Sequence, residues 1–270
     1  MSNTTQKNLI KATGIIGGAQ FISILIGVVR TKTIAILLGP AGVGITGMLQ
    51  SIIDLVRNLT GFGLNYSAVK DIAEADASED NAKINKIITV LQNLVLWTGL
   101  SGMILTIIFA KPLGSFTFGN SDYTWPIVYL SVTLLLTSIS GGQMALLQGK
   151  REINLMAKAT MFGALFSAVF SIAVYYFYGV EGIVPALILT AFISLFFSWY
   201  YARSIPYNRQ KISIKTTVSQ GLGMAKLGFF IVITGFMATL TLYVVRVFIS
   251  NKMGLDAVGY FQASWMISNL

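Results

Sequence analysis

Residues 26–45 read IGVVRTKTIAILLGPAGVGI, an apolar run that contains Arg30 and Lys32 and is broken by the loop residues LGPAG. Similar runs recur along the chain. Of its 270 residues, 54% are hydrophobic and only 11% are charged, whereas about a quarter of the residues of a soluble domain are charged. The runs are long enough for spanning helices and lack the ten-residue alternation of a β-barrel. The sequence therefore predicts an all-α integral membrane protein.

The apolar runs predict seven spanning helices and the start of an eighth. They lie at 12–38, 43–66, 88–110, 125–147, 159–178, 183–202 and 227–249, and the eighth begins near 258. The acidic loop 70–86 is expected to be a solvated amphipathic segment. The chain has no cysteine and no histidine. It therefore offers no thiol chemistry and lacks the commonest metal ligand, so we expect no metal and no cofactor.

The positive charges predict the orientation in the membrane. Of the 19 Lys and Arg residues, 13 lie in the N-terminal segment and in the loops 67–87, 148–158 and 203–226. Only Lys111 and Lys252 lie in the loops between them. Because loops rich in Lys and Arg stay in the cytoplasm, the N-terminus is predicted to be cytoplasmic.

An internal repeat predicts the architecture. GVVRTKTIAILLGPAGVGI at 27–45 aligns with YVVRVFISNKMGLDAVGY at 243–260, because Val-Val-Arg matches at an offset of 216 and Gly-x-x-x-Val-Gly at 215. The two copies run in the same direction, as in transporters built from two six-helix lobes. We expect a six-helix lobe over 1–202, a cytoplasmic linker over 203–226 and the start of a second lobe over 227–270. The chain is then an N-terminal portion of a protein with about 12 to 14 helices.

Charged side chains inside the predicted spans point to a cavity. Each costs roughly 2.5–3.5 kcal/mol at a helix centre, so it must be paired, reach the interface or face water. Helical spacing gives the helices at 12–38 and 43–66 one polar face each. A spanning helix with a polar face lines a cavity or a protein interface rather than lipid. The predicted cavity-lining residues are Gln20, Gln50, Asp54, Asn58 and Asn65.

Some of these charges also have simpler explanations. Lys32 lies about 200° around the helix from Arg30, and its side chain can extend to the interface, so it is at most a minor part of a site. Asp54 and Arg57 are three residues apart and can form a pair that only lets the helix insert. Yet Arg30, Arg57 and Arg246 outnumber the one aspartate of the spans. This surplus predicts an anion site, because guanidinium groups bind phosphate oxygens in pairs.

The stretch VVRTKTIAILLGPAGVGITGMLQSIIDLVRNLTGFGL at 28–64 resembles the first helix pair of Wzx-type O-antigen and polysaccharide repeat-unit flippases. These carriers belong to the multidrug/oligosaccharidyl-lipid/polysaccharide (MOP) exporter superfamily. The resemblance implies a non-enzymatic flippase of the bacterial inner membrane that acts in lipopolysaccharide biosynthesis. It would move undecaprenyl-diphosphate-linked oligosaccharide from the cytoplasmic to the periplasmic leaflet by alternating access. Implied partners are that lipid-linked oligosaccharide, the bilayer and other polysaccharide-assembly membrane proteins, but no nucleic acid.

The resemblance also implies roles for the arginines. In related peptidoglycan-precursor flippases, arginines on the first two helices line the cavity and bind the diphosphate. Arg30 and Arg57 stand at the matching places, but Thr31 replaces the Asp that often follows the first Arg. Arg246 corresponds to them only through the repeat.

Two other functions remain open. A multidrug exporter of the same superfamily would extrude organic cations and tends to carry acids in its lobes, whereas the helix at 12–38 has two cations and no acid. A membrane-embedded enzyme acting on the same lipid would need a large polar loop or a soluble domain. The longest loops have about twenty residues, and none carries a catalytic motif.

Overall fold

A computed structural model describes residues 3–268, except for the side chains of 3–12, 16, 227, 229–231 and 267. Lys7 and Lys11, which counted toward the cytoplasmic charge, have side chains outside this description. The elements are α1 Asn3–Gly61, α2 Leu64–Ala77, α3 Asn81–Phe118, α4 Thr124–Leu130, α5 Val132–Gly149, α6 Ile153–Tyr178, the 3₁₀ helix η1 Gly179–Gly182, α7 Ile183–Ala202, α8 Ile214–Met253 and α9 Leu255–Ser268.

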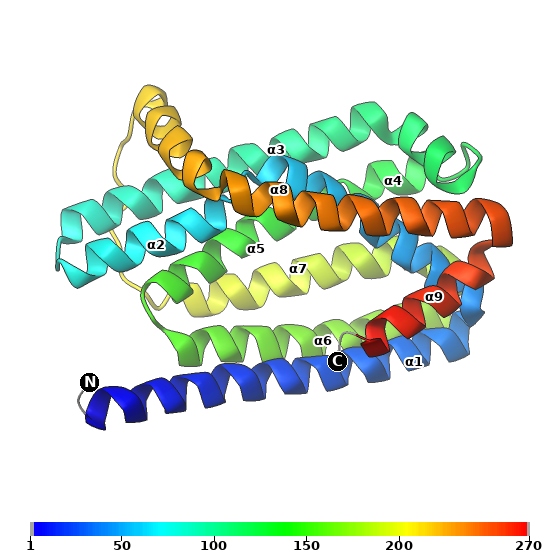
Figure 1. Cartoon of the computed structure of the whole chain (residues 1–270), viewed down its shortest axis with the longest axis horizontal. Coiled ribbons are helices and arrows are strands. Elements are labelled where there is room, and N and C mark those ends of the chain that lie inside the picture. Colours follow the sequence, from blue (N-terminus) through cyan, green and yellow to red (C-terminus); the bar gives the residue numbers. More distant parts are fainter. Residues whose placement is uncertain (1–2, 269–270) are drawn as a thin grey trace.

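The described chain is an all-α bundle of long helices that lie side by side (Figure 1). Five segments are long and apolar enough to cross a membrane, and two of them, 13–61 and 153–202, contain a break where the chain changes direction. These segments account for the seven predicted spans, and α9 is the predicted start of the eighth. The fold class expected from composition is therefore confirmed.

The break inside α1 has the same geometry as the break between α8 and α9. Gly39 has φ 68° and ψ −179°, and Gly254 has φ 86° and ψ 173°. This region of backbone conformation is open essentially to glycine alone. Pro40 begins the second half of α1, where a proline is favoured because its missing N–H has no partner in the first turn. The two copies of the sequence repeat thus share one backbone turn, as the alignment predicts.

The opposite end of the bundle differs from the prediction. The helix predicted at 43–66 ends at Gly61, because Phe62 (φ 47°) and Gly63 (φ 65°) adopt the left-handed conformation. The first half of the segment predicted to be solvated belongs to α2, which buries Leu64, Ala68, Ile72 and Ala75 against α3, α5 and α8. The sequence did not predict this helix as a packed element, because acidic residues occupy its exposed face. We call this end of the bundle the α2 end and the other the Gly39 end.

The segment predicted as a linker over 203–226 is only partly irregular. Residues 205–213 have no regular structure, and α8 begins at Ile214. The irregular part is held to α3, since the backbone N–H of Asn208 donates to Asn85 Oδ1 (3.1 Å) and that of Gln210 to Thr89 Oγ1 (3.2 Å). The remainder of the predicted linker is the first part of α8, which lies at an angle to the rest of that helix, and the later part of α8 runs along the bundle (Figure 1).

Candidate functional site

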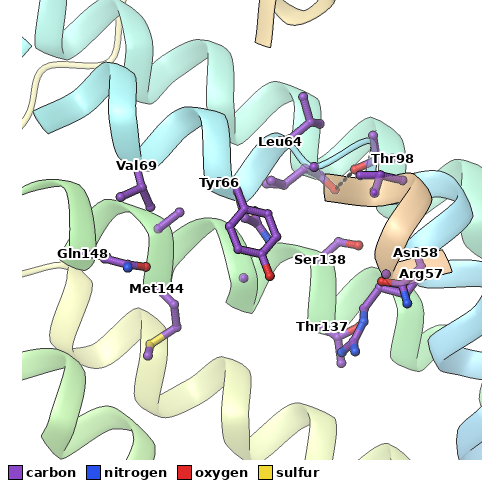
Figure 2. A pocket seen from close by; sticks show the side chains of 18 of the residues that line it. Arg57, Asn58, Leu64, Tyr66, Val69, Thr98, Thr137, Ser138, Met144 and Gln148 are labelled. Carbon is purple, nitrogen blue, oxygen red and sulfur yellow. Dashed lines mark hydrogen bonds between the residues drawn. The ribbon is translucent and has the colours of Figure 1, made fainter. Parts of the chain in front are cut away.

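A cavity of about 850 Å³ with both polar and apolar lining residues lies in the α2-end half of the bundle, between α1, α2, α3, α5 and α8 (Figure 2). Among the described residues that line it, Arg57 is the only charged one. The others that carry hydrogen-bonding side chains are Asn58, Asn65, Tyr66, Thr98, Thr137, Ser138, Gln148 and Thr234. One cation among amides and hydroxyls gives the cavity the chemistry of a site for an anion that also carries hydroxyl groups.

Arg57 is held in place by the carboxylate one turn before it. Its Nη2 lies 2.9 Å from Asp54 Oδ1, and Gln50 Nε2 donates to the same oxygen at 3.3 Å. The side chains of Arg57 and Asp54 remain 46% and 31% exposed. A half-exposed pair of this kind contributes little stability. It leaves further N–H groups of the guanidinium available to a ligand in the cavity.

Two amides from the predicted polar face also reach the cavity. Asn58 Nδ2 donates to Thr239 Oγ1 (2.7 Å), which joins α1 to α8 across the cavity wall. Asn65 lies in the first turn of α2 and covers Gly141 of α5, where an added Cβ would be 2.6 Å from Asn65 Nδ2. The predicted face therefore continues into the cavity, although α1 ends before Asn65 is reached.

Arg30 lines a different cavity. That cavity has a volume of about 390 Å³, lies between α1, α5, α6 and α7, and is lined mainly by small residues and hydroxyl side chains. Arg30 Nη2 donates to Thr190 Oγ1 (3.2 Å), and its buried Nε has no hydrogen-bond partner among the described residues. The two cavities share only Met144 in their linings. The structure thus places Arg30 and Arg57 on adjoining cavities rather than in one.

Arg246 is buried and lines neither cavity. Its Nη1 donates to Ser51 Oγ on α1, and its Nη2 donates to Gln262 Oε1 on α9 (2.5 Å). It therefore joins α8 to both neighbouring helices. The remaining predicted site residues lie outside both linings: Gln50 contacts Asp54, which is itself absent from the linings, whereas Gln20 and Lys32 are exposed.

Sequence reasoning missed the contribution of α5 to the cavity. Ser138, Gly141, Ala145 and Gln148 all line it and follow one another at helical spacings of three, four and three. That spacing is a polar-and-small face of the kind recognised on the first two helices, so the signal was present in the sequence. Tyr66 carried no such signal, because its place depends on the turn at Phe62 and Gly63.

The fold and the cavity define a multi-pass helical membrane protein with a cavity lined by one arginine and by several amide and hydroxyl side chains. The profile of a polysaccharide biosynthesis protein family matches residues 9–270. The chain therefore belongs to this family.

Two curated relatives are similar to shorter parts of the chain. The lipid III flippase of Escherichia coli K12 is 25% identical over 190 residues, which are 67% of this chain and 45% of the relative. The stage V sporulation protein B of Bacillus subtilis is 26% identical over 155 residues, which are 56% of this chain and 29% of the relative. The chain thus spans less than half the length of the curated relatives it matches.

Solved structures of transporters share the fold. An outward-facing multidrug resistance MATE family transporter of the MOP superfamily superposes with a TM-score of 0.69 and 16% identity, over 96% of this chain and 60% of that one. A MOP superfamily transporter from Pyrococcus furiosus gives a TM-score of 0.69 and 15% identity over the same shares. At this level of identity the likeness shows the arrangement of helices alone.

Proposed function

We propose that the protein is a flippase that moves a polyprenyl-diphosphate-linked oligosaccharide, such as an O-antigen repeat unit, across the bacterial inner membrane. The observation that carries this proposal is the α2-end cavity, where Arg57 is the only charged residue among the described lining residues and lies beside amides and hydroxyls. A diphosphate needs directional cationic donors, and sugars need neutral hydrogen-bonding groups. Membership of a polysaccharide biosynthesis family and similarity to a protein named a lipid III flippase support the same substrate class.

Arg57 is the proposed primary contact of the diphosphate. Arg30, in the cavity beyond Met144, is the proposed second contact. Arg246 takes part only in a conformation in which its bonds to Ser51 and Gln262 have opened. In the proposed orientation the α2 end and the N-terminus are cytoplasmic, so lipid-linked sugar enters this cavity from the cytoplasmic leaflet while its polyprenyl tail stays in the bilayer.

A multidrug exporter is the alternative. Such a carrier binds organic cations, which favour acids in the cavity, and neither Asp nor Glu is among the described residues that line this one. The likeness to multidrug transporters rests on structures at 14–16% identity, which share the fold alone. The similar proteins give an enzymatic role no support, because they are named a lipid III flippase and a stage V sporulation protein.

The test of the proposal separates an anion site from a structural ion pair. The chain in lipid nanodiscs is titrated with undecaprenyl diphosphate. Hydrogen bonds to charged groups contribute about 1.5–3 kcal/mol, so Arg57→Ala should weaken binding by at least roughly tenfold, and Arg57→Lys should restore part of it. Asp54→Asn is added to Arg57→Ala so that no carboxylate is left unpaired. If this double variant binds like the wild type, Arg57 is only the partner of Asp54 and the diphosphate role is wrong.

A further inference from the structure

An exposed aromatic ring lies in the middle of the α2-end cavity. Tyr66 is 65% exposed although it lines the cavity. Figure 2 shows it between Arg57 and Gln148, with its ring directed into the open space. Its hydroxyl has no hydrogen-bond partner among the described residues. A large uncovered ring inside a polar cavity indicates a surface that a ligand covers.

The break between α1 and α2 is what places this ring. Phe62 and Gly63 both adopt positive φ, and the backbone N–H of Tyr66 donates to Gly63 O at 3.1 Å. The turn is held by a close approach to α8, because an added Cβ at Gly63 would lie 2.8 Å from Gly228 Cα. A non-glycine residue with positive φ is uncommon, so this local geometry has an energetic cost. One result of the turn is that Tyr66 projects from a fixed point of the cavity wall.

Uncommitted amides flank the ring. Asn65 and Gln148 are exposed to the cavity, and neither side chain bonds to another described residue. An amide offers two donors and one acceptor in a plane, a pattern that matches neighbouring hydroxyl groups on a sugar ring. The apolar C–H face of a sugar ring in turn packs on the electron-rich face of an aromatic ring. Tyr66 and these amides thus supply both kinds of contact.

We propose that Tyr66 is the platform of a sugar-ring subsite, with Asn65 and Gln148 as its hydrogen-bonding edge. This inference rests on the proposed flippase function and assigns the sugar to one part of the cavity. On α5 the lining runs from Thr137, near Arg57, to Gln148. These twelve residues extend about 16 Å along the helix axis. The cavity therefore has room for an anion beside Arg57 and a separate ring over Tyr66.

An organic cation is the other ligand that an exposed tyrosine attracts, through its ring face. The lining offers this occupant no carboxylate, because Arg57 is the only charged residue among its described lining and the nearby carboxylate of Asp54 is paired with Arg57. A neutral, hydroxyl-rich ring attached to an anion fits both the ring and the charge. Cation binding is therefore an outcome that the experiment must be able to detect.

The experiment measures how much a single sugar adds to binding. The chain in nanodiscs is titrated with undecaprenyl diphosphate, with the same lipid carrying one N-acetylglucosamine, and with tetraphenylphosphonium. The variants are Tyr66→Ala, Tyr66→Phe and Gln148→Ala. Tyr176→Ala is the matched control, because Tyr176 is also highly exposed (70%) but lies outside the cavity. All three positions are exposed, so the four variants should fold, and a thermal unfolding scan checks this.

The wild type should bind the glycosylated lipid more tightly than the bare diphosphate. Tyr66→Ala should weaken binding of the glycosylated lipid by about five- to tenfold and leave the bare diphosphate unchanged. Tyr66→Phe should keep most of the difference, Gln148→Ala should reduce it, and Tyr176→Ala should have no effect. A full sugar-dependent gain in Tyr66→Ala overturns the subsite while leaving the flippase proposal intact. If neither lipid binds, or Tyr66→Ala abolishes binding of tetraphenylphosphonium alone, the proposed function and the subsite both fail.

Discussion

Replacing Gly44 or Gly259 by alanine should push α1 and α9 apart at the Gly39 end. The two glycines occupy equivalent places in the repeat and make reciprocal contacts. An added Cβ at Gly259 would lie 2.0 Å from Pro40 O, and one at Gly44 would lie 2.3 Å from Leu255 O. Carbon–oxygen contacts are normally about 3.3–3.6 Å. The helices must therefore separate by about 1 Å at each substituted site, because the opposing atoms belong to the backbone and cannot rotate away.

The size of the effect follows from overpacking. Forcing an extra carbon into a close-packed contact costs about 1–3 kcal/mol. For a chain of this size each kcal/mol shifts Tm by roughly 2–4 °C, so each variant should unfold about 2–12 °C below the wild type. Gly223→Ala is the control, because Gly223 lies inside α8 with no atom within 4 Å of an added Cβ. There alanine should be neutral or stabilising, since it is the better helix former.

The assay is thermal unfolding in detergent, followed by circular dichroism at 222 nm. The double variant Gly44→Ala/Gly259→Ala gives a second check, because both substitutions separate the same pair of helices. Once one substitution has separated the helices, the other should cost less stability. The decrease in Tm of the double variant should therefore be smaller than the sum of the decreases of the two single variants. Equal Tm values for Gly44→Ala, Gly259→Ala and Gly223→Ala would refute the reasoning.

Three further predictions concern orientation and charge. Single cysteines placed at Ser78 and Ser121 in this cysteine-free chain should react differently with an impermeant thiol reagent added to intact cells. The cysteine at 121 should be labelled and the cysteine at 78 should be protected. Labelling of position 78 but not of position 121 contradicts the proposed orientation. Lys32→Ala should change undecaprenyl diphosphate binding less than twofold, since Lys32 is exposed outside the cavity, and a loss like that of Arg57→Ala would contradict this. Partial burial, and then the charge of Glu74, raise the pKa of Asp71 in α2. Folding therefore disfavours its ionised form, so Asp71→Asn should raise Tm slightly at pH 8, and this gain should shrink as the pH falls toward the raised pKa; a gain that grows on acidification contradicts it.

The spanning helices were predictable because the bilayer sets their length and composition. Apolar runs gave every spanning helix, and the repeat located the equivalent turns at Gly39 and Gly254. Ends of helices were less predictable. The sequence 62–66 is compatible with a continuing helix, and only the backbone contact of Gly63 with Gly228 of α8 accounts for the turn there. A contact between residues so far apart in the chain leaves no periodic signal.

The candidate site was predictable where it depended on one helix face. Asp54, Arg57 and Asn58 lie close together, as their spacing requires, and Arg57 and Asn58 line the cavity. The prediction that Arg30 and Arg57 share one anion site depended on their charge and on the resemblance to the flippase family. Spacing within single helices does not say which helices α1 packs against. The structure places Thr190 of α7 beside Arg30, and that neighbour determines which cavity the arginine faces.

The repeat gives Arg30 and Arg246 equivalent positions but different partners. Arg30 bonds to Thr190 of α7, whereas Arg246 crosses from α8 to Ser51 of α1. The Arg246 bond and the glycine contacts both join α8 and α9 to α1, and both lie toward the Gly39 end, while the large cavity lies toward the α2 end. Under the proposed orientation this arrangement is closed toward the periplasm. Under the proposed function, we expect transport to that side to require opening of the Arg246–Ser51 bond and of the backbone contacts of Gly44 and Gly259, because these contacts hold α8 and α9 to α1.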